Sequence, residues 1–99
     1  MDRKRKFDTF SSEPLTESKL DDIAGSISRS WKSVGRKLSL SELELREIDL
    51  DYSTSGEREK AFQMLITWRE RDPENCVSEK LFSILTESGL KHTALKLYL

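Results

Sequence analysis

The segment from Trp31 to Leu38 reads WKSVGRKL. Its residues Trp31, Val34 and Leu38 follow the three- and four-residue spacing that places side chains on one face of an α-helix. The positions between them carry mostly basic or small side chains. The pattern therefore predicts a short helix over residues 30–38, with one apolar face and one basic face.

A second helix is predicted on the N-terminal side of this segment, from residue 16 onward. Thr16 or Ser18 can cap it by accepting a hydrogen bond from a free backbone N–H group of the first turn. Its apolar residues recur at the spacing of a single buried face. They are Leu20, Ile23, Ala24 and Ile27.

The next helix on the C-terminal side has the clearest start. Ser41 precedes Glu44 by three residues, which is the spacing of a capping box, in which each side chain accepts a hydrogen bond from the other residue's backbone N–H. The helix is predicted to end near Leu50. Its inward residues are expected to be Leu45 and Ile48.

The longest helical pattern covers residues 56–71. Ala61, Leu65 and Trp68 form its apolar stripe. Pro73 is expected to end this helix, because proline lacks the backbone N–H and disfavours helical backbone in the residue before it.

Two shorter helices complete the pattern. Asn75 or Ser78 can cap the first of them, and Gly89 can end it in the left-handed conformation. Their apolar residues are Val77, Leu81, Ile84 and Leu85 in the first helix and Leu90, Ala94, Leu95 and Leu97 in the second. No segment alternates apolar and polar residues as a half-buried strand would. The sequence therefore predicts an all-α globular bundle whose core includes Trp31 and Trp68.

The composition limits the functions open to the chain. Its 17 basic and 18 acidic residues leave a formal net charge of -1, which gives no overall bias toward nucleic acid or anionic membrane. The single Cys76 and the single His92 cannot form an intrachain disulfide, a Cys/His zinc site or a His-dependent triad. We therefore expect no catalytic residue, no metal and no cofactor, and we interpret Cys76 as a structural thiol.

Residues 1–15 show neither helical nor strand periodicity. They combine a basic run, Arg3 to Lys6, with Ser, Thr, Glu and Pro, which predicts a flexible leader before a folded domain over residues 16–99. No apolar stretch of a signal peptide follows the basic run. No segment reaches the roughly 18 apolar residues of a membrane span. With one cysteine and no disulfide, the chain is expected to be cytoplasmic.

The segment from Trp31 to Leu38 resembles the second helix of death domains: a Trp, two variable residues, an aliphatic residue, a small residue and a Leu four positions after the aliphatic one. The segments from Glu47 to Tyr52 and from Glu59 to Trp68 are similar to the third and fourth helices of that family. The resemblance spans about residues 18–97. It is strongest to the death domains of receptor-interacting protein kinases and of the Fas-associated adapter.

The resemblance implies a six-helix antiparallel bundle with Greek-key connections. It also implies homotypic binding to other death domains of receptors, adapters or kinases, in apoptotic or innate-immune signalling of the NF-κB type. The sister families fit less well. The Arg-x-Asp-Leu motif of death-effector domains is absent, since Arg46 and Asp49 have the wrong spacing, and caspase-recruitment domains usually lack the pair Trp31 and Trp68.

Charge placement suggests how such binding would occur. Basic residues lie on the predicted helix over residues 30–38, and acidic residues dominate the helix after it. If the two groups face different directions, one copy can bind the next in an asymmetric, propagating contact. Arg36 matches a contact position of the family and is the first candidate for partner binding. The other candidates are Lys32, Lys37, Glu42, Glu47, Asp49, Glu57 and Arg58.

Two alternatives remain open at this stage. The basic leader and the basic helix would suit a small helical nucleic-acid-binding domain, although the acidic helix would repel phosphate unless it is turned away. The chain could also be a structural module of a larger protein that binds no other death domain.

Overall fold

The computed structural model describes residues 15–98, and that part of the chain contains helices and no strand. The α-helices are α2 (Glu17–Ile27), α3 (Trp31–Lys37), α4 (Glu42–Asp51), α5 (Glu57–Arg71), α6 (Ser78–Glu87) and α7 (Lys91–Leu95), and the 3-10 helices are η1 (Ser28–Ser30), η2 (Pro73–Asn75) and η3 (Lys96–Tyr98). The predicted all-α fold is confirmed. None of these helices has the length and the apolar character needed to cross a membrane.

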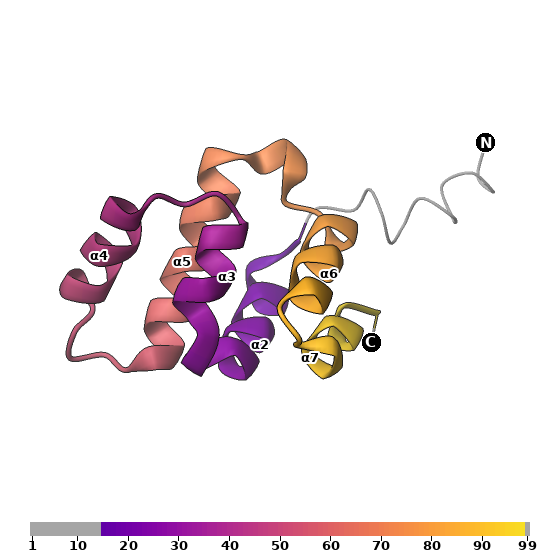
Figure 1. Cartoon of the computed structure of the whole chain (residues 1–99), viewed down its shortest axis with the longest axis horizontal. Coiled ribbons are helices and arrows are strands. Elements are labelled where there is room, and N and C mark those ends of the chain that lie inside the picture. Colours follow the sequence, from indigo (N-terminus) through magenta and orange to yellow (C-terminus); the bar gives the residue numbers. More distant parts are fainter. Residues whose placement is uncertain (1–14, 99) are drawn as a thin grey trace.

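Helix α5 is the element around which the others are arranged. It contacts α2, α3 and α4, while α6 packs against α7 and α3. Figure 1 shows α4 at one end of the molecule and α6 and α7 toward the other. Helix α3 therefore lies between α4 and α6, and its outward face is central on one side of the molecule.

Both tryptophans lie in the core, as predicted. Trp31 is 3% exposed and Trp68 is 2% exposed. Between them, Gly35 allows α3 to approach its neighbours closely, because a Cβ atom at this position would lie 2.7 Å from Leu45 Cδ2 and 3.2 Å from Met64 Cγ. The small residue of the α3 pattern is thus required by packing.

The predicted caps of α2 and α4 are present. The Thr16 hydroxyl accepts a hydrogen bond from the Lys19 N–H at 3.2 Å, so Thr16 rather than Ser18 caps α2. In α4, Ser41 and Glu44 form both hydrogen bonds of the capping box. Gly89 has φ 78° after the end of α6, which confirms the left-handed termination.

The predicted cap of α6 is wrong. Helix α6 starts after Val77, and no side chain accepts a hydrogen bond from its first turn. Asn75 instead donates to both carboxylate oxygens of Asp72, which closes the turn after α5. Ser78 is the first residue of the helix and is buried, so it lies one position too late to cap it.

The predicted leader falls outside the described residues except for Leu15. Leu15 is buried in the core, and its backbone N–H donates to the Cys76 carbonyl at 3.2 Å. The packed unit therefore includes Leu15.

Candidate interaction surface

Helix α3 has one apolar face, which packs into the core, and one basic face, which is directed outward. Trp31 and Val34 are buried, whereas Arg36 and Lys37 are exposed and Lys32 is half-buried. The exposure of these basic side chains follows from the helical period, which directs the residues between two core positions toward solvent. Arg29, in η1 just before α3, extends the same basic group.

Helix α4 places an acid directly against this face. Arg36 Nε donates to Glu42 Oε2 at 2.5 Å, and Arg36 Nη2 donates to Glu42 Oε1 at 3.3 Å. This hydrogen-bonded pair raises the pKa of Arg36 and lowers the pKa of Glu42. The arginine keeps 51% of its side chain exposed while it is paired, so it stays accessible to a further acidic group.

Asp49 is the second acid of α4 on this surface. Its carboxylate accepts from Lys32 Nζ and from Lys60 Nζ, each at 2.7 Å. Hydrogen bonds from both lysines lower the pKa of Asp49 to about 2, and the bond to Asp49 raises the pKa of Lys60. Because Lys60 belongs to α5 and is buried, Asp49 fixes the relative positions of three helices.

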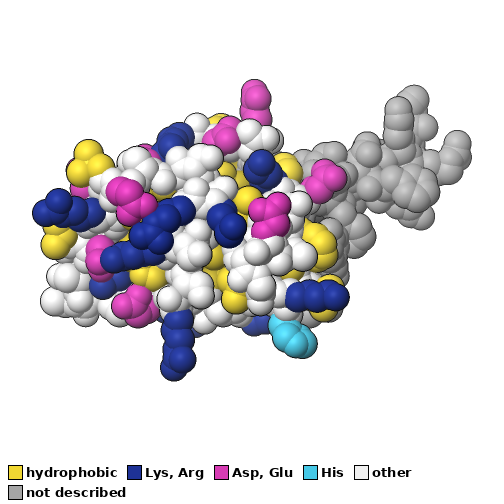
Figure 2. All heavy atoms as spheres, viewed as in Figure 1, with side chains coloured by type: hydrophobic (Ala, Val, Ile, Leu, Met, Phe, Trp, Pro, Cys, Tyr) yellow, Lys and Arg dark blue, Asp and Glu magenta, His cyan; other side chains and the backbone are white. Residues whose placement is uncertain are grey.

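Trp31 joins the surface to the start of α5. Its Nε1 donates to Glu57 Oε1 at 2.8 Å, and the ammonium of Lys32 lies 5.7 Å from the centre of the indole ring, a cation–π contact. These residues border a shallow polar hollow lined by Arg29, Ser30, Trp31, Lys32, Ser33, Arg36, Asp49 and Glu57. Figure 2 shows Lys and Arg side chains next to Asp and Glu side chains over the middle of this face.

The two charged groups therefore do not face different directions. The short connection over residues 38–41 returns the chain beside α3, so the acids of α4 pair with the cations of α3. The prediction of two separate patches, one basic and one acidic, is therefore wrong for α3 and α4. The surface is one mixed patch in which basic residues stay in excess, since Arg29 and Lys37 form no ion pair with any residue in 15–98.

Two other predicted site residues lie elsewhere. Glu47 is exposed on α4 and forms no ion pair within the described part of the chain. Arg58 is exposed at the start of α5 and pairs with Asp21 of α2 at 3.2 Å. The structure thus brings together Lys32, Arg36, Glu42, Asp49 and Glu57, whereas Lys37 lies at the end of α3.

Sequence reasoning missed Lys60, a buried lysine that holds Asp49 of this surface in place. A lysine on an amphipathic helix is expected to be solvated. Its spacing did indicate burial. Lys60 precedes Met64 by four residues and Trp68 by eight, so it lies on the same helix face as these two buried residues. A cation on that face has to reach an acid across the bundle, and Asp49 supplies it.

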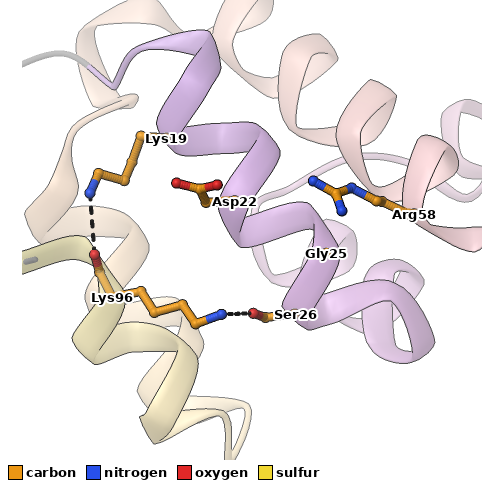
Figure 3. A pocket seen from close by; sticks show the side chains of 6 residues that line it. All are labelled: Lys19, Asp22, Gly25, Ser26, Arg58 and Lys96. Carbon is orange, nitrogen blue, oxygen red and sulfur yellow. Dashed lines mark hydrogen bonds between the residues drawn. The ribbon is translucent and has the colours of Figure 1, made fainter.

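A second polar hollow lies between α2, the start of α5 and η3 (Figure 3). There Lys19 Nζ donates to the Lys96 carbonyl at 3.3 Å, and Lys96 Nζ donates to Ser26 Oγ at 2.5 Å. Arg58 and Asp22 also line it. These hydrogen bonds join η3 to α2 and so hold the C-terminal turn against the rest of the bundle.

The chemistry of the one thiol points away from catalysis. Cys76 is buried, and desolvation raises its pKa to about 11, the opposite of what a nucleophilic thiol requires. Among residues 15–98, no group of three or more His, Cys, Asp or Glu side chains is arranged to hold a metal ion.

Comparison with known proteins places this geometry in a family. The chain is 40% identical over 58 residues to receptor-interacting serine/threonine-protein kinase 1 of Homo sapiens, covering 59% of this chain and 9% of the kinase. It is 28% identical over 93 residues to the tumor necrosis factor receptor type 1-associated DEATH domain protein of Xenopus laevis, covering 89% of this chain and 31% of that protein. THO complex subunit 1 of Mus musculus is 26% identical over 82 residues, covering 83% of this chain and 12% of that protein.

The chain thus spans between about a tenth and a third of the length of these relatives. The death-domain family model matches residues 17–99, which include every helix described above. Death domains are non-catalytic protein–protein interaction modules. On this match the chain belongs to the death-domain family.

Proposed function

We propose that this chain assembles with the death domains of receptors, adapters or kinases in apoptotic or innate-immune signalling of the NF-κB type, and that assembly in the cytoplasm is its output. The names of two relatives support the partner class, since one is a receptor-interacting kinase and the other is associated with a tumor necrosis factor receptor. We assign the chain the six-helix Greek-key arrangement of the family as part of the same proposal.

The observation that supports this proposal most strongly is the exposure of Arg36. It lies on the central outward face of α3, half-exposed although it is paired with Glu42. An exposed ion pair contributes roughly 0–1 kcal/mol to stability. A carboxylate of a partner can therefore share or replace Glu42 at little cost, while the neighbouring cations Lys32 and Lys37 attract it.

Acids on the same surface define the partner further. Glu42 and Asp49 alternate with the cations, so a complementary partner presents both signs of charge and not a uniform row of phosphates. This arrangement favours a protein surface over nucleic acid, which binds through an uninterrupted excess of Lys and Arg. Glu47 and Arg58, which lie outside the α3 patch, are proposed as additional partner contacts.

The experiment is a pull-down of the purified chain against a panel of death, death-effector and caspase-recruitment domains. Arg36→Glu is the test variant. Arg69→Glu is the matched control, because it reverses an arginine that also pairs with a glutamate, Glu17, at 3.1 Å but lies on α5. Capture of a death domain that only Arg36→Glu loses is the expected result. No capture, or equal capture by both variants and the wild type, would contradict the proposal.

A further inference from the structure

Helix α4 has apolar residues on two opposite faces. Leu45 and Ile48 point into the core, whereas Leu43 is 62% exposed and Leu50 is 64% exposed. The exposed leucines are seven residues apart, so they lie almost in line along the helix, about 10 Å from each other. Isolated exposed leucines are common, but two in line on the outer face of one helix form a stripe.

The two charged residues nearest the stripe have opposite signs, and the exposed acids Glu42 and Asp51 lie farther round the helix, about 90° from the leucines. At about 100° per residue, Arg46 lies about 50° to one side of the two leucines and Glu47 about 50° to the other. Both side chains are exposed, and neither forms an ion pair with another residue in 15–98. Helix α4 stands at the end of the molecule away from α6 and α7, so this face points away from the bundle (Figure 1).

We infer that this face binds the same face of a second copy of the chain, with the two α4 helices parallel about a two-fold axis. In that arrangement each leucine meets its own counterpart. The two-fold axis exchanges the flanks, so Arg46 of each copy lies beside Glu47 of the other, and two ion pairs form. The leucine stripe and its flanking charges are thus self-complementary.

The charges also select the direction of the helices. In an antiparallel pair, the two-fold axis stands perpendicular to both helices and brings identical flanks together. Arg46 would then lie beside Arg46 of the second copy, and Glu47 beside Glu47, which is repulsive on both sides. Only the parallel pair combines burial of the leucines with charge compensation.

This contact is small and therefore weak. One face of a ten-residue helix buries far less than the roughly 1,200–2,000 Å² of a stable interface. It forms where the local concentration of the chain is high, as in an assembly held together by other contacts. Because the contact closes on itself, it joins two copies and does not propagate. It uses none of the α3 side chains.

Sedimentation equilibrium of the 99-residue chain, from about 10 μM to about 1 mM, tests the contact. The wild type is expected to show a monomer–dimer equilibrium in this range. Arg46→Glu and Glu47→Arg should each weaken it by about tenfold or more, because each replaces two attractive pairs by two repulsive ones. An equimolar mixture of the two variants should restore dimers, since both pairs re-form between unlike partners.

The controls reverse exposed charges on other helices. Lys91→Glu on α7 and Glu87→Arg on α6 should dimerise as the wild type does. Arg36→Glu should also leave this dimer intact, so failure of the proposed partner surface and failure of the α4 contact are distinguishable. A wild type that stays monomeric at about 1 mM, or a mixture that fails to restore dimers, would overturn the inference.

Disulfide trapping tests the helix direction independently. With Leu50→Cys alone, a parallel pair brings the two new thiols together, and mild oxidation should give a covalent dimer. Leu43→Cys should behave in the same way. Rapid cross-linking only when the two variants are mixed would show an antiparallel pair and contradict the inference. Cys76 is buried and does not compete.

Discussion

Trp31 Nε1 donates a 2.8 Å hydrogen bond to Glu57 Oε1, which joins the first residue of α3 to the first residue of α5. Trp31 as a whole is 3% exposed, so its indole N–H has little access to water and depends on this acceptor. Glu57, predicted from sequence as a partner contact, therefore also has a role inside the domain.

Removal of the acceptor should destabilise the fold. We expect Glu57→Ala to lower the free energy of unfolding by about 1–2 kcal/mol, because the buried indole N–H loses its partner and the first turn of α5 loses an acid. Glu57→Gln keeps an acceptor oxygen and should lose less than half as much. Urea unfolding followed by far-UV circular dichroism measures both. Equal stability of the alanine variant and the wild type would contradict the role.

Asp49 should make stability depend on pH in the acid range. Its folded pKa of about 2 lies below the ordinary 3.8, so its contribution is present above pH 3.8 and is lost as the pH falls toward 2. Asp49→Asn removes the contribution at all pH values and leaves Lys60 buried without its carboxylate. We therefore expect this variant to be less stable at neutral pH and to show a flatter loss of stability on acidification.

Urea midpoints measured from pH 6 to about pH 2 check this expectation. Glu47→Gln is the matched control, because it neutralises a carboxylate of the same helix that forms no ion pair in the described residues. The midpoints of Asp49→Asn and the wild type should converge at the acid end. Parallel curves over the whole range would show that the bonds to Lys32 and Lys60 do not stabilise the native state.

Gly35 and Gly25 should respond in opposite ways to added side chains. Gly35→Val forces atoms against Leu45 and Met64 and should destabilise by about 3 kcal/mol. Gly25→Ala should stabilise by up to about 1 kcal/mol, because it lies within α2 and meets only the end of the flexible Arg58 side chain, at 3.3 Å. Thermal unfolding compares the two variants. Equal tolerance at both positions would contradict the close packing of α3.

Cys76 should be chemically inert in the folded chain. A pKa of about 11 instead of 9.0 lowers the thiolate fraction near pH 8 by about a hundredfold, and burial slows access further. We expect labelling by a thiol reagent to be at least about a hundredfold slower in the native chain than in urea. Labelling at the rate of a free thiol would show that the segment after η2 opens readily.

Local patterns predicted the elements of this fold well. The capping box of Ser41 and Glu44, the cap at Thr16, the left-handed Gly89 and the burial of both tryptophans all depend on residues close in sequence or on helical period. The wrong cap of α6 is also local, since Asn75 is used by Asp72 three residues earlier. When a side chain has two possible hydrogen-bond partners, as Asn75 has, spacing alone does not determine which of them it binds.

The interaction surface was predicted less completely because its contacts are distant in sequence. Asp49 meets Lys60 across 11 positions, Trp31 meets Glu57 across 26, and the α3–α4 pair of Lys32 and Asp49 is 17 positions apart. These contacts depend on the angle at which two helices pack, which hydrophobic periodicity does not specify. The sequence therefore identified the charged residues of α3 and α4 but not that they neutralise one another.

The central claim is that the positive charge of Arg36 binds an acidic group of a partner death domain. Titration calorimetry with the death domain captured in the pull-down tests it most directly, using the wild type, Arg36→Lys and Arg36→Glu at one salt concentration. Lysine keeps the charge but cannot form the two-pronged pair with Glu42.

The account predicts that Arg36→Lys binds within about threefold of the wild type and that Arg36→Glu binds at least about tenfold more weakly, with unchanged helicity. Binding of Arg36→Glu at wild-type strength would contradict the claim. Equal loss in both variants would also contradict it, because it would mean that the pair with Glu42, and not a charge presented to the partner, is what binding requires.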